Sequence, residues 1–292
     1  MEKASPWILA ARPKTLTAAL APFFVAASLA HSIHPDLEYW ILLLGLGASL
    51  CIQIATNYFN DAIDHRRGTD RAERLGPTRA AAAGLLPARH LVIAAWALLL
   101  LALFLGIPLM VRGGLPVFFI GIASLACAYL YTGGPLPLAY LGLGEIFVLL
   151  FFGIIPVATL VFLLRGEWRP EALLAGMQLG LLCSVLISIN NYRDSEQDRE
   201  TEKKTLSARF GPAFSRNLID VLLFAPFALN LVWALGRPVA ALLPLLLLPL
   251  AISISKRVHA LAPSRELNAE LARSSLLYLG FSVMLSVGLL FT

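Results

Sequence analysis

Charged residues are scarce in this chain. They make up 14% of its 292 residues, whereas soluble domains average about 25%. Hydrophobic residues account for 58% of the sequence, and the mean hydropathy is +0.76. A chain made mainly of soluble globular structure is therefore excluded, and a membrane protein is indicated.

Cysteine and histidine are also few. The three cysteines, Cys51, Cys127 and Cys183, lie inside apolar stretches without paired spacing, and the five histidines are scattered through loops. This pattern supports neither a disulfide framework nor a metal site of the zinc type. The net charge of +5 does not indicate nucleic-acid binding, because the basic residues lie in short loops between apolar stretches.

Long apolar stretches dominate what is present. A helix needs about 20 apolar residues to cross a bilayer. No linker or separate soluble segment interrupts the stretches, so residues 1–292 are predicted to form one integral-membrane domain, an all-α bundle of nine transmembrane helices. The predicted spans are 15–33, 38–58, 91–110, 115–132, 144–164, 172–192, 216–235, 239–255 and 274–291.

Lysine and arginine are distributed unequally between the two sets of loops. The set that includes the N-terminus holds 19 of the 23 basic residues, and the other set holds 4. Basic residues collect in cytoplasmic loops. We therefore expect a multi-pass protein of the plasma (inner) membrane with a cytoplasmic N-terminus, and nine spans would put the C-terminus outside.

Two of the predicted helices end in amides and carboxylates. In the first, Asn57 and Asp61 are four residues apart, as are Asn60 and Asp64, and Gln53 extends the same stripe one turn deeper. Residues at this spacing are neighbours on one face of a helix. A basic loop follows directly.

The second polar helix end repeats the pattern. Asn190, Asp194 and Asp198 recur at intervals of four, and Asn191 lies three residues before Asp194. Clustered carboxylates repel one another unless a cation lies among them, and oxygen ligands without histidine or cysteine suit Mg²⁺. The alternative is that each loop is solvated and its acids pair with its own arginines.

Three stretches carry a family resemblance. "NYFNDAIDHRRGTDRAERLGPTRA", "YTGGPLPLAYLGLGEIFVLLFFG" and "NNYRDSEQDRETEKKTLSARFG" together resemble the UbiA superfamily of intramembrane aromatic prenyltransferases. Within it they look most like the branch that prenylates 1,4-dihydroxy-2-naphthoate in menaquinone synthesis. The resemblance covers nearly the whole chain in order.

The resemblance implies a helical bundle around a central cavity that opens to the bilayer. A polyprenyl diphosphate would bind there with Mg²⁺, lose its diphosphate and alkylate the naphthoate with loss of CO₂, giving demethylmenaquinol. Leaving diphosphate develops charge on its oxygens, and Mg²⁺ with arginine and lysine would stabilise that charge. The nearest alternatives are sister enzymes that prenylate 4-hydroxybenzoate, homogentisate or haem.

The resemblance also implies roles for particular residues. The metal ligands would be Asp61, Asp64, Asp194 and Asp198, with Asn60 as a further catalytic group. The family's first motif normally ends in an aspartate where this chain has Gly68, and Asp70 follows two residues later. Asp70 is for that reason left outside the expected ligand set.

Two further groups of residues are assigned to the substrates. Arg12 and Lys14 bind either the diphosphate or, as ordinary anchors, the cytoplasmic membrane surface, and either Lys203 or Lys204 would face the phosphates. The residues expected to bind diphosphate are Arg12, Lys14, Arg67, Lys203 and Lys204. The residues expected to bind the acceptor or the prenyl chain are Asn57, Tyr131, Glu145, Asn190 and Asn191.

A transporter is the rival from a different class, because acids within membrane spans often mark ion paths. Such acids would be expected near mid-bilayer at broken helices. Here they lie at the ends of helices, which favours chemistry on a diphosphate head group at the membrane surface.

Overall fold

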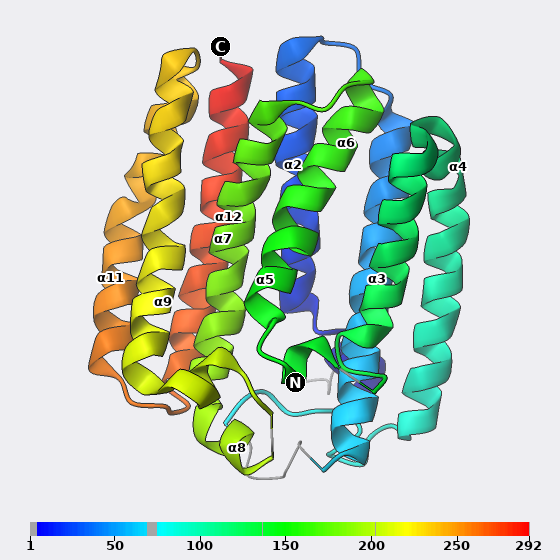
Figure 1. Cartoon of the computed structure of the whole chain (residues 1–292), viewed down its shortest axis with the longest axis vertical. Coiled ribbons are helices and arrows are strands. Elements are labelled where there is room, and N and C mark those ends of the chain that lie inside the picture. Colours follow the sequence, from blue (N-terminus) through cyan, green and yellow to red (C-terminus); the bar gives the residue numbers. More distant parts are fainter. Residues whose placement is uncertain (1–4, 69–74, 136, 202, 292) are drawn as a thin grey trace.

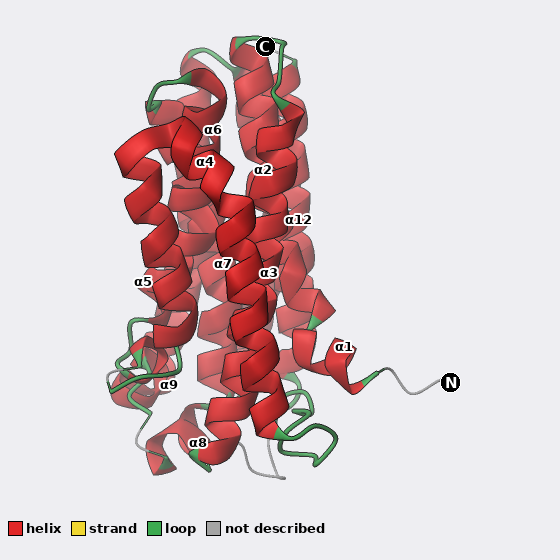
Figure 2. Cartoon of the chain, turned by 90° about the vertical axis from the view of Figure 1, so that its right-hand side faces the viewer, coloured by secondary structure: helices red, strands yellow, loops and turns green. Residues whose placement is uncertain are grey.

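The structure is a computed structural model that describes residues 5–68, 75–135, 137–201 and 203–291. Within these ranges the chain forms helices and loops and no strand (Figure 2). The helices are α1 (Pro6–Ala11), α2 (Pro13–Ile33), α3 (Tyr39–Arg66), α4 (Ala88–Leu130), η1 (Leu138–Tyr140), α5 (Gly144–Leu149), η2 (Leu150–Ile154), α6 (Ile155–Arg165), α7 (Pro170–Arg193), α8 (Ser195–Glu200), α9 (Leu206–Asn230), η3 (Leu231–Leu235), α10 (Pro238–Leu242), η4 (Leu243–Leu247), α11 (Leu248–Ala260) and α12 (Leu267–Leu290).

Eight helical segments of the described chain are long and apolar enough to cross a membrane. One of them, α4, consists of two helices joined at Gly114, whose φ of 66° and ψ of −157° are not helical. A residue without a Cβ adopts this positive φ easily, so the chain reverses there within a few residues. Counted as two arms, α4 supplies the predicted spans 91–110 and 115–132, and the all-α membrane bundle is confirmed.

The described N-terminal and C-terminal ends of the chain lie at opposite ends of the bundle (Figure 1). The end that carries the N-terminus also carries α8 and the ends of α3 and α7. Helices α9 and α11 form one side of the bundle, packed on α7 and α12, and the two arms of α4 form the other side beside α3. The two polar helix ends therefore meet at one end of the molecule.

Large apolar side chains cover the outside of the bundle. Leu43, Val111 and Leu115 are each about 70–80% exposed, and large exposed apolar surfaces of this kind mark contact with a membrane or another apolar partner. Aromatic residues suited to the membrane interface are exposed near both ends, for example Trp7 at one end and Trp40 at the other. The protein is a multi-pass integral membrane protein.

The backbones of two neighbouring segments touch in the middle of the bundle. A Cβ added to Gly153 would lie 2.3 Å from the Gly176 carbonyl oxygen and 2.4 Å from Cα of Gly180. Gly176 and Gly180 form a small-xxx-small pair on α7, a pattern that permits close helix packing in membranes. The π-helical turn η2 and the helices that flank it are therefore held firmly against α7.

Buried apolar side chains form two separate clusters. The larger gathers residues of α2, α6, α7, α9 and α12, and the smaller gathers residues of α1, α3 and the arms of α4. A cavity of about 1180 Å³ lies among α2, α3, α4, α5 to α6, α7 and α12. This volume exceeds the usual upper range for small-molecule pockets of about 1,000 Å³.

Candidate functional site

The cavity is polar at one end and apolar elsewhere. Most of its polar lining comes from the starts of α2 and α12, the ends of α3 and α7 and the loop after α3, which share one end of the bundle. Three arginines, Arg12, Arg79 and Arg193, are its charged lining residues in the described part of the chain, and no Asp, Glu, His or Lys side chain there lines it. The cavity therefore suits an anionic head group joined to a long apolar tail.

The end of α3 contributes four polar residues to this region. Asn60 lines the cavity and accepts a hydrogen bond from the Thr132 hydroxyl. Asp61 is 1% exposed, and its two carboxylate oxygens accept hydrogen bonds from the backbone amides of Ala80 and Ala81 at 2.9 and 3.0 Å. Asp61 thus holds the turn that carries Arg79, and its role as a metal ligand stays a prediction.

This arrangement makes Asp61 important for stability. Replacing it with Ala should leave two buried amides without partners, at a cost of about 2–4 kcal/mol in the free energy of unfolding. Asp61→Asn keeps one acceptor oxygen and should cost about half as much. The midpoint of unfolding in detergent measures both, with Asp36→Ala, at an exposed position, as the control. Unchanged stability of Asp61→Ala would contradict the role.

Asp64 lies one turn beyond Asp61 and has different partners. Its carboxylate accepts a hydrogen bond from the Tyr140 hydroxyl at 2.8 Å and pairs with Arg79 at 3.7 Å. The Arg67 guanidinium lies 4.9 Å from the centre of the Tyr140 ring, and the Lys203 ammonium lies 5.9 Å from it. Tyr140 therefore connects the end of α3 to the segment that follows α8.

The end of α7 is organised around a buried arginine. Arg193 is fully buried and binds the Asp194 carboxylate through two hydrogen bonds of 2.7 and 2.6 Å. It also donates to the side-chain oxygens of Asn190 at 2.7 Å and Asn268 at 2.6 Å. Asn268 in turn donates to the backbone carbonyl of Leu75 at 3.0 Å, which links α7 and α12 to the loop after α3.

Asp198, on the short helix α8, is the remaining predicted ligand. Burial raises the pKa of its carboxyl above the ordinary value, and the Lys203 ammonium, 3.5 Å away, opposes the shift. Its carboxylate also accepts a hydrogen bond from Thr205 at 3.2 Å. A further positive charge beside Asp198 would therefore stabilise the ionised carboxylate.

Across the described residues, no three His, Cys, Asp or Glu side chains gather closely enough to form a metal cluster. The carboxylates of Asp64, Asp194 and Asp198 are each paired with a basic side chain, namely Arg79, Arg193 and Lys203. Carboxylate oxygens are the donors that a hard divalent ion prefers. Asp194 and Asp198 are buried, and Asp64 is partly buried.

Comparison with known proteins identifies the family. The UbiA prenyltransferase family model matches residues 19–281. The chain belongs to the UbiA prenyltransferase family. It is 32% identical to the 1,4-dihydroxy-2-naphthoate octaprenyltransferase of Haemophilus influenzae, with 99% of this chain and 97% of that protein covered. It is 34% identical to the enzyme of the same name from Mycobacterium tuberculosis, with 100% and 99% covered.

A solved structure of a UbiA homolog from Archaeoglobus fulgidus bound to DMAPP and Mg²⁺ shares the fold. Its TM-score is 0.65 at 16% identity, and the match covers 97% of this chain and 100% of that one. The resemblance seen in the sequence is therefore confirmed at the level of the family and of its fold.

The residues expected to bind diphosphate do not all face the cavity. Arg12 lines the cavity. Arg67 and Lys203 flank Tyr140, whereas Lys204 is exposed and its backbone amide donates to the Tyr140 carbonyl at 2.9 Å. The side chain of Lys14 lies outside the described residues, as does the whole of Asp70.

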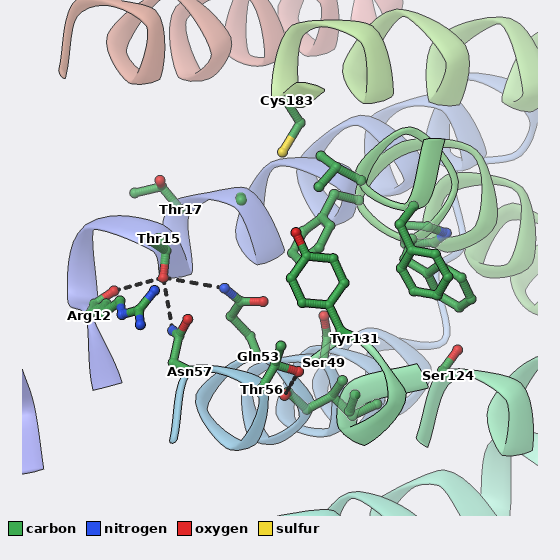
Figure 3. A pocket seen from close by; sticks show the side chains of 18 of the residues that line it. Arg12, Thr15, Thr17, Ser49, Gln53, Thr56, Asn57, Ser124, Tyr131 and Cys183 are labelled. Atoms are coloured by element: carbon green, nitrogen blue, oxygen red, sulfur yellow. Dashed lines mark hydrogen bonds between the residues drawn. The ribbon is translucent and has the colours of Figure 1, made fainter. Parts of the chain in front are cut away.

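The residues expected to bind the acceptor or the prenyl chain fall into two groups. Asn57, Tyr131 and Asn190 line the cavity, and Asn57 and Tyr131 are visible there in Figure 3. Glu145 and Asn191 are buried beyond the lining and bond to each other, with Nδ2 of Asn191 3.0 Å from Oε1 of Glu145. The second pair supports the wall of the UbiA-family cavity without facing it.

Sequence reasoning did not single out several residues that complete the site. They are Thr132 and Tyr140, which bond to Asn60 and Asp64, and Arg193 and Asn268, which bond to each other. Arg79, one of the arginines after the first polar helix end, pairs with Asp64. Tyr140 lies in the quoted stretch "YTGGPLPLAYLGLGEIFVLLFFG", and the available signal was a tyrosine in an otherwise apolar Gly/Pro-rich turn. The burial of Arg193 has no counterpart in the sequence pattern.

Proposed function

We propose that this protein transfers a polyprenyl group from polyprenyl diphosphate to 1,4-dihydroxy-2-naphthoate, releasing CO₂ and diphosphate and giving demethylmenaquinol. It works as one membrane domain, residues 1–292. The main support is identity of 32% and 34% along nearly the full length of two enzymes named for this reaction. The cavity, cationic at one end and apolar elsewhere, is the physical counterpart of such a substrate.

The composition of the cavity lining favours a decarboxylating reaction. The prenyl C1–oxygen bond breaks and its electron pair leaves with diphosphate. The ring carbon that bears the carboxylate then bonds to the prenyl carbon, and the ring–carboxylate bond breaks as CO₂ departs, returning its electron pair to the ring. No ring proton has to be removed, which agrees with the lack of Asp, Glu, His and Lys among the described lining residues.

Mg²⁺ is the proposed cofactor. Asp64, Asp194 and Asp198 would hold it together with phosphate oxygens, because carboxylates are the oxygen donors that this ion prefers. Asp194 and Asp198 are buried, and Asp64 is partly buried. Asp61 would be the fourth ligand, and both its oxygens also accept hydrogen bonds from backbone amides. When bound, the ion would neutralise the negative charge that develops on the departing diphosphate.

The side chains of the protein itself serve the two ends of the prenyl substrate. Arg12 and Arg79 would donate to phosphate oxygens. The buried Arg193 adds positive charge at the same end, and its own donors bind protein side chains. Near them, Tyr131 lies 6.0 Å from Phe147, and Phe147 stacks on Phe151 at 4.5 Å between ring centres. These aromatic faces in a water-excluding cavity would stabilise an allylic cation.

An acceptor comparison with purified protein tests the proposal. With polyprenyl diphosphate and Mg²⁺, carboxyl-labelled naphthoate should release one labelled CO₂ for each product formed. 4-Hydroxybenzoate and homogentisate, offered in parallel, should give little product. Prenylation of 4-hydroxybenzoate with its carboxylate retained, and none of the naphthoate, would contradict the assignment.

The same proposal includes an orientation in the plasma (inner) membrane, with the N-terminus and the polar helix ends in the cytoplasm. Its support is the excess of 19 basic residues over 4. A phosphatase that is active only outside the cytoplasm, fused after residue 291, should give strong activity. A fluorescent protein that matures only in the cytoplasm should stay dark at the same position. The reverse pair of results would overturn the orientation.

A further inference from the structure

Arg12 has a backbone conformation that arginine rarely adopts. With a φ of 52° and a ψ of 70°, it is the one non-glycine residue with positive φ in the described part of the chain. It forms the junction between α1 and α2. Left-handed residues with a Cβ are strained, persist only where their surroundings enforce them, and cluster at functional sites.

Side chains from α2 and α3 enforce this conformation. The Thr15 hydroxyl donates to the Arg12 carbonyl at 2.9 Å. The Asn57 amide donates to the Thr15 hydroxyl at 3.0 Å and to the Ala11 carbonyl at 2.9 Å. Gln53 adds a longer bond of 3.3 Å to the same hydroxyl. Figure 3 shows these side chains converging on the turn.

The conformation has a direct consequence for the side chain. A left-handed residue directs its Cα–Cβ bond differently from a helical or extended one, and here the Arg12 side chain is part of the cavity wall. Asn57 is 3% exposed, and both N–H groups of its amide are engaged by the turn. It therefore has little capacity left to donate to a substrate.

We propose that Thr15 and Asn57 are positioning residues that hold Arg12 in the left-handed conformation, so that its guanidinium faces the diphosphate of the prenyl substrate. The inference rests on the proposed function and assigns Asn57 a role through Arg12 in place of direct contact with the acceptor or the prenyl chain. The backbone strain at Arg12 is offset because the conformation orients its rigid guanidinium, which can donate two hydrogen bonds, toward the diphosphate.

A purely structural role for the turn predicts different results. Glycine adopts positive φ without strain, so Arg12→Gly should preserve or improve thermal stability while it removes the guanidinium. Arg12→Gly should bind diphosphate about 10- to 100-fold more weakly, the effect of one lost charge-assisted hydrogen bond. If the network served only to join α1 and α2 to α3, changes at Thr15 or Asn57 would lower stability without weakening diphosphate binding.

Calorimetric binding of inorganic diphosphate to the full-length protein in detergent, with Mg²⁺ present, is the test. Thr15→Val and Asn57→Ala should each weaken binding about tenfold, as for other residues that orient a ligand-binding group, and Thr15→Ser should restore it. Asn217→Ala, at an exposed position on α9, is the matched control and should bind normally. Thermal unfolding of each variant shows that the protein is folded.

The decisive measurement combines two substitutions. Because Asn57 acts through Arg12, adding Asn57→Ala to Arg12→Gly should weaken diphosphate binding no further. Additive losses, or normal binding by Arg12→Gly, would overturn the proposal. Naphthoate turnover is measured on the same samples. The expected binding pattern without naphthoate prenylation would support this inference while contradicting the proposed acceptor.

Discussion

Asp198→Asn is expected to lower turnover about a thousandfold, equivalent to about 4 kcal/mol of transition-state stabilisation. The substitution keeps a side-chain oxygen for Thr205 but removes the charge that the proposed Mg²⁺ requires. Asp64→Asn should have a similar effect, since its carboxylate lies at the other polar helix end. Both variants should also need more Mg²⁺ for half-maximal activity than the unaltered protein.

The matched control for these variants is Asp220→Asn. Asp220 lies on α9, where it accepts hydrogen bonds from Ser255 at 2.6 Å and His259 at 2.8 Å, and it is not part of the cavity lining. Turnover by this variant should stay within about twofold of normal. Substitutions away from the core and from functional groups usually change the free energy of unfolding by no more than about 0.5 kcal/mol. Near-normal turnover by Asp198→Asn and Asp64→Asn at limiting Mg²⁺ would contradict the proposed ligand set.

The second large effect concerns the acceptor. 1,4-Dihydroxynaphthalene lacks the carboxylate, so its prenylation would require removal of a ring proton. Among the described residues the cavity lining offers no Asp, Glu, His or Lys side chain as a base, and a positioned base contributes about 10²–10⁴-fold to rate. We therefore expect turnover of this analogue at least about a hundredfold below that of the naphthoate.

Binding and chemistry can be separated in this experiment. The analogue should compete with the naphthoate, because its two rings and two hydroxyls are unchanged, and the inhibition constant measures that binding. The methyl ester of the naphthoate, which cannot release CO₂ directly, should likewise inhibit without forming product. Rapid prenylation of the dihydroxynaphthalene at a ring carbon that bears hydrogen would show that a base is present after all.

The fold was largely predictable because membrane helices have simple requirements. Apolar length alone placed each span, including the two arms of α4. Their turn at Gly114 lies in the glycine pair Gly113–Gly114, between two apolar stretches. The predicted first and last residues of the helices were less accurate than their number and order. The last helix begins at Leu267, not near residue 274, because Glu270 and Arg273 pair with each other and let a polar first turn stay helical.

The site was only partly predictable. Asp61 and Asp64 look equivalent in the sequence, three residues apart on one helix face. Their difference arises because the chain near Ala80 folds back and presents two amides to Asp61 alone. Likewise, the pattern around Asp194 does not reveal that Arg193 is fully buried. Which partner meets a polar group depends on distant segments, and local spacing carries no information about them.

The bond network around Asn268 has a consequence for the synthesis of the protein. Asn268 is on the last helix, and it supports both Arg193 and the backbone at Leu75. A nascent chain that has inserted its first eight membrane crossings already contains both acidic helix ends, but it lacks the residue that ties them together. Membrane insertion of α12 would thus complete the proposed site, and a ribosome-bound chain without it is expected to be inactive.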